Sequence, residues 1–161
     1  MKTHHLAAAM IAALVAGAAL AAVGLPEVRL TPGEIATMSK GGAGAGTSGV
    51  AGIQTTILSG DPTRAGPYTI EIRVPPHTRI QAHTHRDSRS AVVVSGRWFF
   101  GYGTQAAESS VKELVAGSFY TEPAGVAHFA LTREEPAAVF ISGIGPTDTI
   151  YTASNKQESG K

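Results

Sequence analysis

The residues best suited to metal chemistry lie in one short stretch, residues 81–96, which reads QAHTHRDSRSAVVVSG. His83 and His85 stand two residues apart, in front of a β-branched run. In an extended chain such a pair leaves the same face of the strand, so both imidazoles can reach one ion. His128 follows a Pro and a Gly that turn the chain into a later strand-like run. The spacing predicts a metal site made of His83, His85 and His128.

The same stretch lacks the carboxylate that is expected shortly after a metal-binding histidine pair, and Arg89 stands at that position. A guanidinium has five donors and no acceptor, so Arg89 cannot ligate a metal. Three interpretations follow. In the first, three histidines hold the metal and leave open positions for water or substrate. In the second, Arg89 turns aside and pairs with Asp87 or another nearby acid. In the third there is no metal, and His83, His85 and Arg89 together bind an anion.

The first interpretation constrains the substrate. Three neutral imidazoles leave the double positive charge of a divalent metal uncompensated, and Arg89 adds a third positive charge. A negatively charged ligand could chelate the metal and accept a bidentate pair from Arg89. The predicted substrate is therefore a small organic anion or an enolisable oxygen chelate, with Arg89 as its predicted contact in the catalytic site.

Strand-forming segments must position these residues. From Ile53 onward the chain is a series of short apolar or alternating runs broken by Gly, Pro and Asp, and no window keeps a helical period for long. Seven or eight strands in about a hundred residues predict an all-β sandwich or barrel of jelly-roll type. The concave mouth of such a barrel is where a ligand or metal would sit. The runs cover residues 53–60, 67–74, 78–85, 90–103, 111–123, 126–133 and 137–145.

The chain resembles the cupin superfamily (RmlC-like) in two motifs that occur in the right order. The second motif runs Gly, five residues, Pro-x-Gly, two residues, His, three residues, Asn. It is matched at four positions and departs only at the last, where Thr132 replaces Asn. The matched residues are Gly117, Pro123, Gly125 and His128.

The first cupin motif is matched less completely. His83, His85 and Gly96 fit it, but His77 stands where a leading Gly is typical and Arg89 where Glu is typical. His77 is six residues before His83, which makes it a turn or mouth residue rather than a fourth ligand. The chain is also similar to small exported single-domain cupins that share TP.E near the N-terminus, GDP before the second run and GIGP near the end, here residues 31–34, 60–62 and 143–146.

The resemblance implies a double-stranded β-helix barrel in which His83, His85 and His128 hold one divalent metal. Three-His sites occur among iron-dependent cupin dioxygenases, so Fe(II) is the first candidate, with Cu, Zn, Mn and Ni as alternatives. The implied function is a metal-dependent oxygenase acting on a small chelating anion. The alternatives are a non-catalytic module that binds a small molecule or metal, and a lyase or isomerase that uses the metal as a Lewis acid. Cupins are often dimers, so a homodimer is expected.

Composition excludes several other classes of function. The 161 residues include 13 basic and 12 acidic ones, and no stretch concentrates Lys and Arg, so a nucleic-acid partner is not expected. The chain has no cysteine, which excludes disulfides and thiolate catalysis. Its length has room for one domain with short extensions.

The N-terminus predicts export. Lys2 precedes an uncharged apolar run over residues 6–20, and small residues follow as in a signal-peptide cleavage site. Cleavage near residue 22 would release the mature chain to a periplasm or beyond, with no membrane attachment. The alternative is an uncleaved anchor, because residues 6–25 approach the length needed to cross a bilayer.

The remaining segments complete the predicted division of the chain. Residues 23–52 form an extension that ends in a Gly-rich linker, residues 53–151 form the cupin domain, and the polar residues 152–161 form a disordered tail. Within the extension, Thr31, Pro32 and Glu34 predict a short helical turn with a capping box.

Overall fold

The computed structural model describes residues 25–42 and 47–152. The predicted signal peptide and all of the predicted tail after residue 152 lie outside these residues. Within them, no helix has the length and apolar character that crossing a membrane requires.

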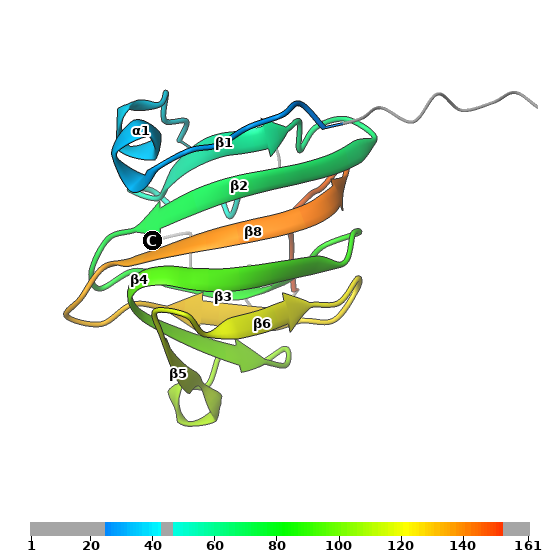
Figure 1. Ribbon diagram of the computed structural model, residues 1–161. Coiled ribbons are helices and arrows are strands. Elements are labelled where there is room, and N and C mark those ends of the chain that lie inside the picture. The colour runs from blue at the N-terminus through cyan, green and yellow to red at the C-terminus, as the bar shows by residue number, and fades with distance from the viewer. Residues whose placement is uncertain (1–24, 43–46, 153–161) are drawn as a thin grey trace, which may run out of the picture.

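The described part of the chain is almost entirely β-structure, as the sequence predicts (Figure 1). One short helix, α1, covers Pro32–Thr37, and a single 3-10 turn covers Glu108–Ser110. The strands are β1 (Gln54–Gly60), β2 (Gly66–Val74), β3 (Arg79–Thr84), β4 (Arg89–Tyr102), β5 (Lys112–Val115), β6 (Phe119–Glu122), β7 (His128–Leu131), β8 (Ala137–Gly145) and β9 (Ile150–Tyr151).

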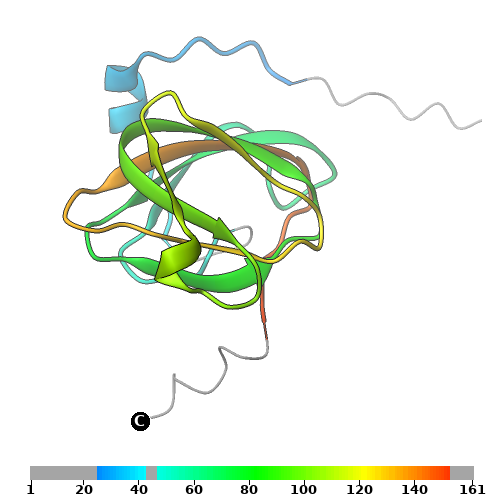
Figure 2. The ribbon, with the colours of Figure 1, turned by 90° about the horizontal axis from the view of Figure 1, so that it is seen from below.

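The strands form a curled antiparallel sheet in the order β1-β2-β8-β4-β7-β3-β9, with β5 and β6 pairing with β4. Seen along its axis, the sheet curls round a central interior (Figure 2). The long strand β4 joins the two halves, because its first part pairs with β6 and β8 and its second part with β5 and β7. Gly96 makes this change of partner feasible. Its φ is 72°, and a Cβ atom there would overlap the carbonyl oxygen of Pro136.

Apolar side chains from both halves fill the interior and leave the polar cluster at one end. Period-2 alternation places Tyr68, Ile70, Ile72 and Val74 of β2 inside and holds along the first part of β4, whereas residues 98–101 of β4 are all buried. Of the alternating aromatics on β4, Trp98 and Phe100 are buried, whereas Tyr102 is half exposed. The largest fully buried apolar side chains are Trp98, Tyr68, Phe129, Ile70, Val74, Val93 and Val139.

The N-terminal extension contains a capped helix and is hydrogen-bonded to the barrel at its end. The capping box of α1 is confirmed: Glu34 N–H donates to Thr31 Oγ1 at 3.3 Å, and Thr31 N–H donates to Glu34 Oε2 at 2.7 Å. Farther along, Thr149 Oγ1 donates to the carbonyl of Thr47 at 2.9 Å, and the Tyr151 hydroxyl donates to that of Ser48. The end of the Gly-rich segment is therefore held against the strand that follows β8.

Candidate metal centre

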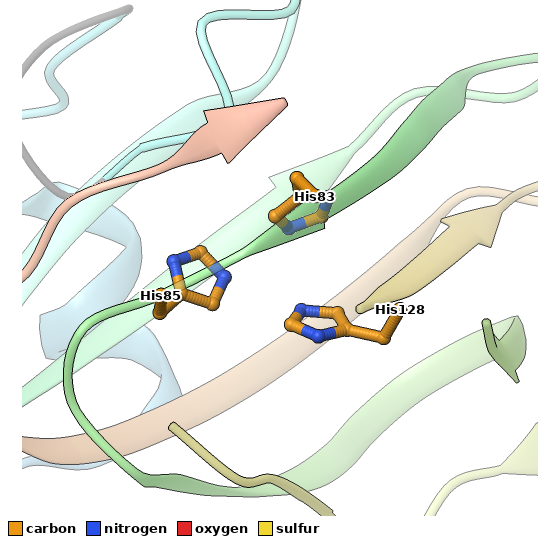
Figure 3. Close-up of side chains that lie close together, drawn as sticks. All are labelled: His83, His85 and His128. Atoms are coloured by element: carbon orange, nitrogen blue, oxygen red, sulfur yellow. The ribbon is translucent and has the colours of Figure 1, made fainter. Parts of the chain in front are cut away.

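The structure brings the three predicted histidines together. His83 lies on β3, His85 directly follows that strand, and His128 begins β7. His83 and His128 are direct cross-strand partners, so backbone pairing sets their proximity. The three side chains point toward one another (Figure 3), and one ligand nitrogen from each lies within 4.8 Å of the other two. All three residues are buried.

Each imidazole is oriented by a backbone carbonyl. A carbonyl oxygen can only accept, so the Nδ1 atom beside it carries the proton and the Nε2 atom keeps its lone pair. Metal-ligating histidines ordinarily have this arrangement. The Nε2 atom of His128 is buried and has no hydrogen-bond partner. The contacts are His83 Nδ1 to Gln81 O at 2.7 Å, His128 Nδ1 to Val126 O at 3.0 Å, and His85 Nδ1 to Asp148 O.

The environment keeps these imidazoles neutral. Burial lowers the pKa of His83 to about 3, and the neighbouring His128 acts in the same direction. Burial and the charge of Arg89 lower the pKa of His85 to about 4. The pKa of His128 is also lowered by burial. At neutral pH all three lone pairs are therefore free of protons, as metal ligation requires.

Arg89 lies beside the histidines and forms a buried ion pair. It begins β4 and is the cross-strand partner of Glu122, the last residue of β6. Arg89 Nε donates to Glu122 Oε2 at 2.5 Å, and Arg89 Nη2 contacts the same oxygen and also His85 Nε2. Glu122 Oε2 lies 3.6 Å from His85 Nε2 and 3.7 Å from His128 Nε2.

The acid that pairs with Arg89 is not Asp87. The Asp87 carboxylate instead accepts hydrogen bonds from the Tyr68 hydroxyl at 2.8 Å and from Thr147 Oγ1 at 2.6 Å. Arg89 faces the site while its charge is balanced by Glu122. The sequence reasoning missed Glu122, and the only signal for it was its place directly before Pro123 in the second motif.

The charges make Glu122 an ionised group despite its burial. Burial by itself raises the pKa of a carboxyl, but Arg89, His128 and His85 together hold the pKa of Glu122 below its usual value. Tyr120, two residues earlier, behaves differently. Burial and the charge of Glu122 raise its pKa well above the usual value, so its hydroxyl stays protonated.

The space between these groups is small. A cavity of about 30 Å³ adjoins the three histidines, Arg89 and Glu122, which is room for a water-sized molecule. The buried Trp98 Nε1 and Tyr120 hydroxyl also lie at this cavity, and neither has a hydrogen-bond partner. Its remaining lining consists of Thr47, Ser48, Thr149, Phe100, Ala130 and the isoleucines 53, 70, 72, 80 and 141.

His77 lies apart from the site. It occupies the turn between β2 and β3 with φ 54°, a left-handed conformation that suits the glycine typical of that position. Its exposed ring lies 3.4 Å from a Glu134 carboxylate oxygen.

Comparisons with known proteins identify relatives by fold only. No protein-family profile and no curated protein sequence matches the chain. Among solved structures, the polyketide cyclase RemF from Streptomyces resistomycificus is similar over 81% of this chain and 89% of its own, with TM-score 0.59 and 14% identity. A sugar phosphate isomerase of the cupin superfamily from Silicibacter pomeroyi DSS-3 matches over 80% and 82%, with TM-score 0.57 and 16% identity.

A third similar structure is an RmlC-like cupin from Shewanella frigidimarina NCIMB 400, which covers 74% of this chain and 92% of its own, with TM-score 0.54 and 17% identity. Against a structure of DMSP lyases, this chain spans 47% of that protein's length, at TM-score 0.49. The three larger matches each cover 74% or more of this chain, and the two that name an activity name different ones, so the likeness concerns the fold.

Proposed function

We propose that this chain, which has the fold of the cupin superfamily, binds one divalent metal ion through His83, His85 and His128. The observation that carries the proposal is the orientation of the imidazoles. Each Nδ1 is occupied by a backbone carbonyl, so each Nε2 carries the lone pair that a metal would use, and that of His85 is contacted by Arg89 Nη2. The buried, unpartnered Nε2 of His128 supports the same conclusion, because a buried polar atom without a partner is costly unless something binds it.

The donor set suits several metals. Imidazole binds Fe, Cu, Zn and Ni well. Fe(II) is the first candidate because of the resemblance to iron-dependent cupin dioxygenases, and Cu, Zn, Mn and Ni are alternatives. Three protein nitrogens leave coordination positions open, and such a metal would supply oxygen activation or Lewis-acid chemistry there. In either case the chain's own contribution is to fix three neutral imidazoles in a dry, shaped site.

We further propose that the metal-bound protein is an oxygenase that acts on a small chelating organic anion. Open metal positions and the nearby Arg89 guanidinium support this activity. The cavity sets a condition on it, because about 30 Å³ admits a water-sized molecule but no organic substrate. An organic anion would therefore enter only if part of the lining moved, for example Thr47 and Ser48 at the end of the Gly-rich segment, and it would share Arg89 with Glu122.

The cavity volume also favours a second candidate function, a non-catalytic metal-binding module. In such a protein the small cavity retains the ion, and the Arg89–Glu122 pair does not contact a substrate. Oxygen consumption by the iron-loaded protein, tested with diketones and small keto acids, separates the two functions. Substrate-dependent uptake supports the oxygenase, and its absence with every chelating anion supports the binding module.

The experiment for metal binding is elemental analysis after expression in metal-replete medium. We expect about one equivalent of metal in the wild type, almost none in His128→Ala, and an unchanged amount in His77→Ala. The last variant is a matched control, because His77 is an exposed histidine outside the site. A wild-type protein that retains no stoichiometric metal would refute the proposal.

Export and dimer formation are also proposals. The apolar run over residues 6–20 supports export, and mass spectrometry of the protein recovered outside the cytoplasm should then find a mature chain that starts near residue 22. Light scattering of the same material should give a mass of two chains if the protein is a homodimer.

A further inference from the structure

The geometry points to Glu122 as the fourth protein ligand of this metal centre, supplied from β6 in place of the carboxylate that the first motif lacks at Arg89. The inference rests on the proposed metal site and adds a residue to it. Arg89 then acts as a positioning residue that holds the Glu122 carboxylate in place.

The distances carry this assignment. Ligand atoms bound at about 2.1 Å to one ion lie about 3.4 Å apart in a tetrahedral site. Glu122 Oε2 lies 3.6 Å from His85 Nε2 and 3.7 Å from His128 Nε2. Glu122 Oε2 is therefore within a few tenths of an ångström of the spacing that a shared ion requires from each nitrogen, and the imidazoles, whose ligand atoms lie within 4.8 Å of one another, close round the ion as it binds. The Glu122 side chain is only 4% exposed, so no solvent competes for that oxygen.

The pairing of β4 with β6 explains how a carboxylate at position 122 can replace one at position 89. Residues 89 and 122 are direct cross-strand partners, and such partners have Cβ atoms about 5 Å apart on the same face of a sheet. If the residue types at positions 89 and 122 were exchanged, one carboxylate and one guanidinium would therefore still lie beside the histidines. The charge of the site stays as it would be with Glu at position 89 and Arg at position 122.

Arg89 and the metal would share one oxygen of Glu122. A carboxylate oxygen has two lone-pair positions, and in the metal-free site Arg89 Nε and Nη2 both contact Oε2. Arg89 Nη2 also contacts the Nε2 lone pair of His85. Metal and guanidinium compete for both atoms, so metal uptake requires Arg89 Nη2 to withdraw from His85 Nε2 and from Glu122 Oε2, while Arg89 Nε keeps its hydrogen bond to Glu122.

The test compares two buried glutamates, each paired with an arginine. We would measure the affinity for Co²⁺ by competition with a chelator, together with the Co²⁺ absorption spectrum. Glu122→Gln should weaken binding at least about 10–100-fold, the range seen when groups around a metal are lost. Its spectrum should also change, because an anionic oxygen is replaced by an amide. Glu71→Gln should leave both unchanged, because Glu71 pairs with Arg73 outside the site.

A charge-exchanged variant keeps the inference testable if Glu122→Gln folds poorly. In Arg89→Glu/Glu122→Arg the carboxylate returns to position 89, and we expect Co²⁺ affinity within about tenfold of the wild type with a carboxylate-type spectrum. Wild-type affinity and an unchanged spectrum in a folded Glu122→Gln would overturn the role of Glu122 and leave the three-His site standing. No Co²⁺ binding by the wild type would overturn both.

Discussion

Two buried glutamate–arginine pairs in this barrel have the same residue types and different surroundings. Glu71 on β2 pairs with Arg73 through both of its oxygens, at 2.8 and 2.9 Å, and the Arg73 side chain is 42% exposed. Glu122 on β6 pairs with Arg89 through one oxygen, and neither side chain is more than 5% exposed. No histidine is hydrogen-bonded to the Glu71–Arg73 pair, whereas the Glu122–Arg89 pair lies beside His85 and His128.

The difference shows how to separate a structural ion pair from a functional one. Arg73 satisfies the hydrogen-bonding capacity of Glu71 and reaches solvent, so nothing further is needed to explain that pair. Arg89 contacts only one oxygen of Glu122, and that same oxygen also lies within 3.7 Å of two imidazole nitrogens. Burial alone does not mark a functional acid, because both glutamates are buried. The marker is the set of possible metal ligands beside the carboxylate.

The largest expected effect is on stability when each arginine is removed. Arg89→Met leaves Glu122 as an uncompensated charge inside the barrel, and the free energy of unfolding of the metal-free protein should fall by about 3–5 kcal/mol. Arg73→Met should lower it by about 1 kcal/mol, because water can reach the place of the exposed guanidinium. Urea unfolding of both variants measures the difference.

Added metal should sharpen this contrast. If Glu122 ligates the ion, a saturating divalent metal replaces the charge of Arg89 and restores much of the stability of Arg89→Met by mass action. Arg73→Met should gain no more from metal than the wild type does. Equal losses in the two metal-free variants would remove the distinction between the pairs.

The next largest effect is expected from acid, which should lower the free energy of unfolding because two of the buried histidines resist protonation. The pKa of His83 is about 3 and that of His85 about 4 when folded, against an ordinary value of 6.5. Between these values the unfolded chain binds more protons, so the free energy of unfolding decreases as pH falls through 6.5 toward about 3. At pH 4 the loss is on the order of 3 kcal/mol for each imidazole.

Chelator-treated protein, unfolded with urea at several pH values, gives this slope. His83→Gln removes one of the titrating groups and should make the slope shallower, and bound metal should delay the loss because ligated imidazoles stay unprotonated. A slope that is identical in the wild type and in His83→Gln would contradict the assigned burial of His83.

Much of this site could be predicted from the sequence, because its main features are local. The two-residue spacing of His83 and His85 fixes their common face once the segment is extended, and the second motif locates His128. The capping box at Thr31 and most of the strand runs likewise depend on neighbours in the chain, and the structure confirms them. The single run predicted over residues 111–123 is wrong, because the chain turns within it and forms two strands, β5 and β6.

The partner of Arg89 could not be predicted in the same way. Glu122 meets Arg89 because β6 pairs with the first part of β4, whereas β5 pairs with the second part. Register between segments more than thirty residues apart depends on the curl of the whole sheet and on the change of partner near Gly96. For the same reason the sequence favoured Asp87 as a named partner for Arg89, since Asp87 is nearby in the chain.

A smaller effect is expected at Asp87, a buried acid that pairs with hydroxyl groups instead of an arginine. Its carboxylate accepts from Tyr68 and Thr147 and so holds the turn that carries His85 and Arg89. Tyr68→Phe should lower the free energy of unfolding by about 1.5–3 kcal/mol, the range for a hydrogen bond to a charged group. Tyr102→Phe is the control, because its half-exposed hydroxyl donates to a neutral carbonyl. Equal effects of the two changes would mean that Asp87 gains nothing from Tyr68.

The smallest effect on stability is expected at Ser48, a lining residue of the cavity that separates the Arg89–Glu122 pair from solvent. The exposed Arg73 has no such cover. The Tyr151 hydroxyl donates to the carbonyl of Ser48, and Ser48 lines the cavity. Tyr151→Phe should lower the free energy of unfolding by only about 1 kcal/mol. Without this hydrogen bond the segment that carries Ser48 should move away from the cavity more often. Metal release to an excess of chelator should therefore become about fivefold faster. Thr69→Val, which removes a side-chain hydrogen bond to Ser142 between residues that do not line the cavity, should leave the release rate unchanged. If Tyr151→Phe also leaves it unchanged, the ion leaves by another route, and the shielding of Glu122 does not depend on the Gly-rich segment.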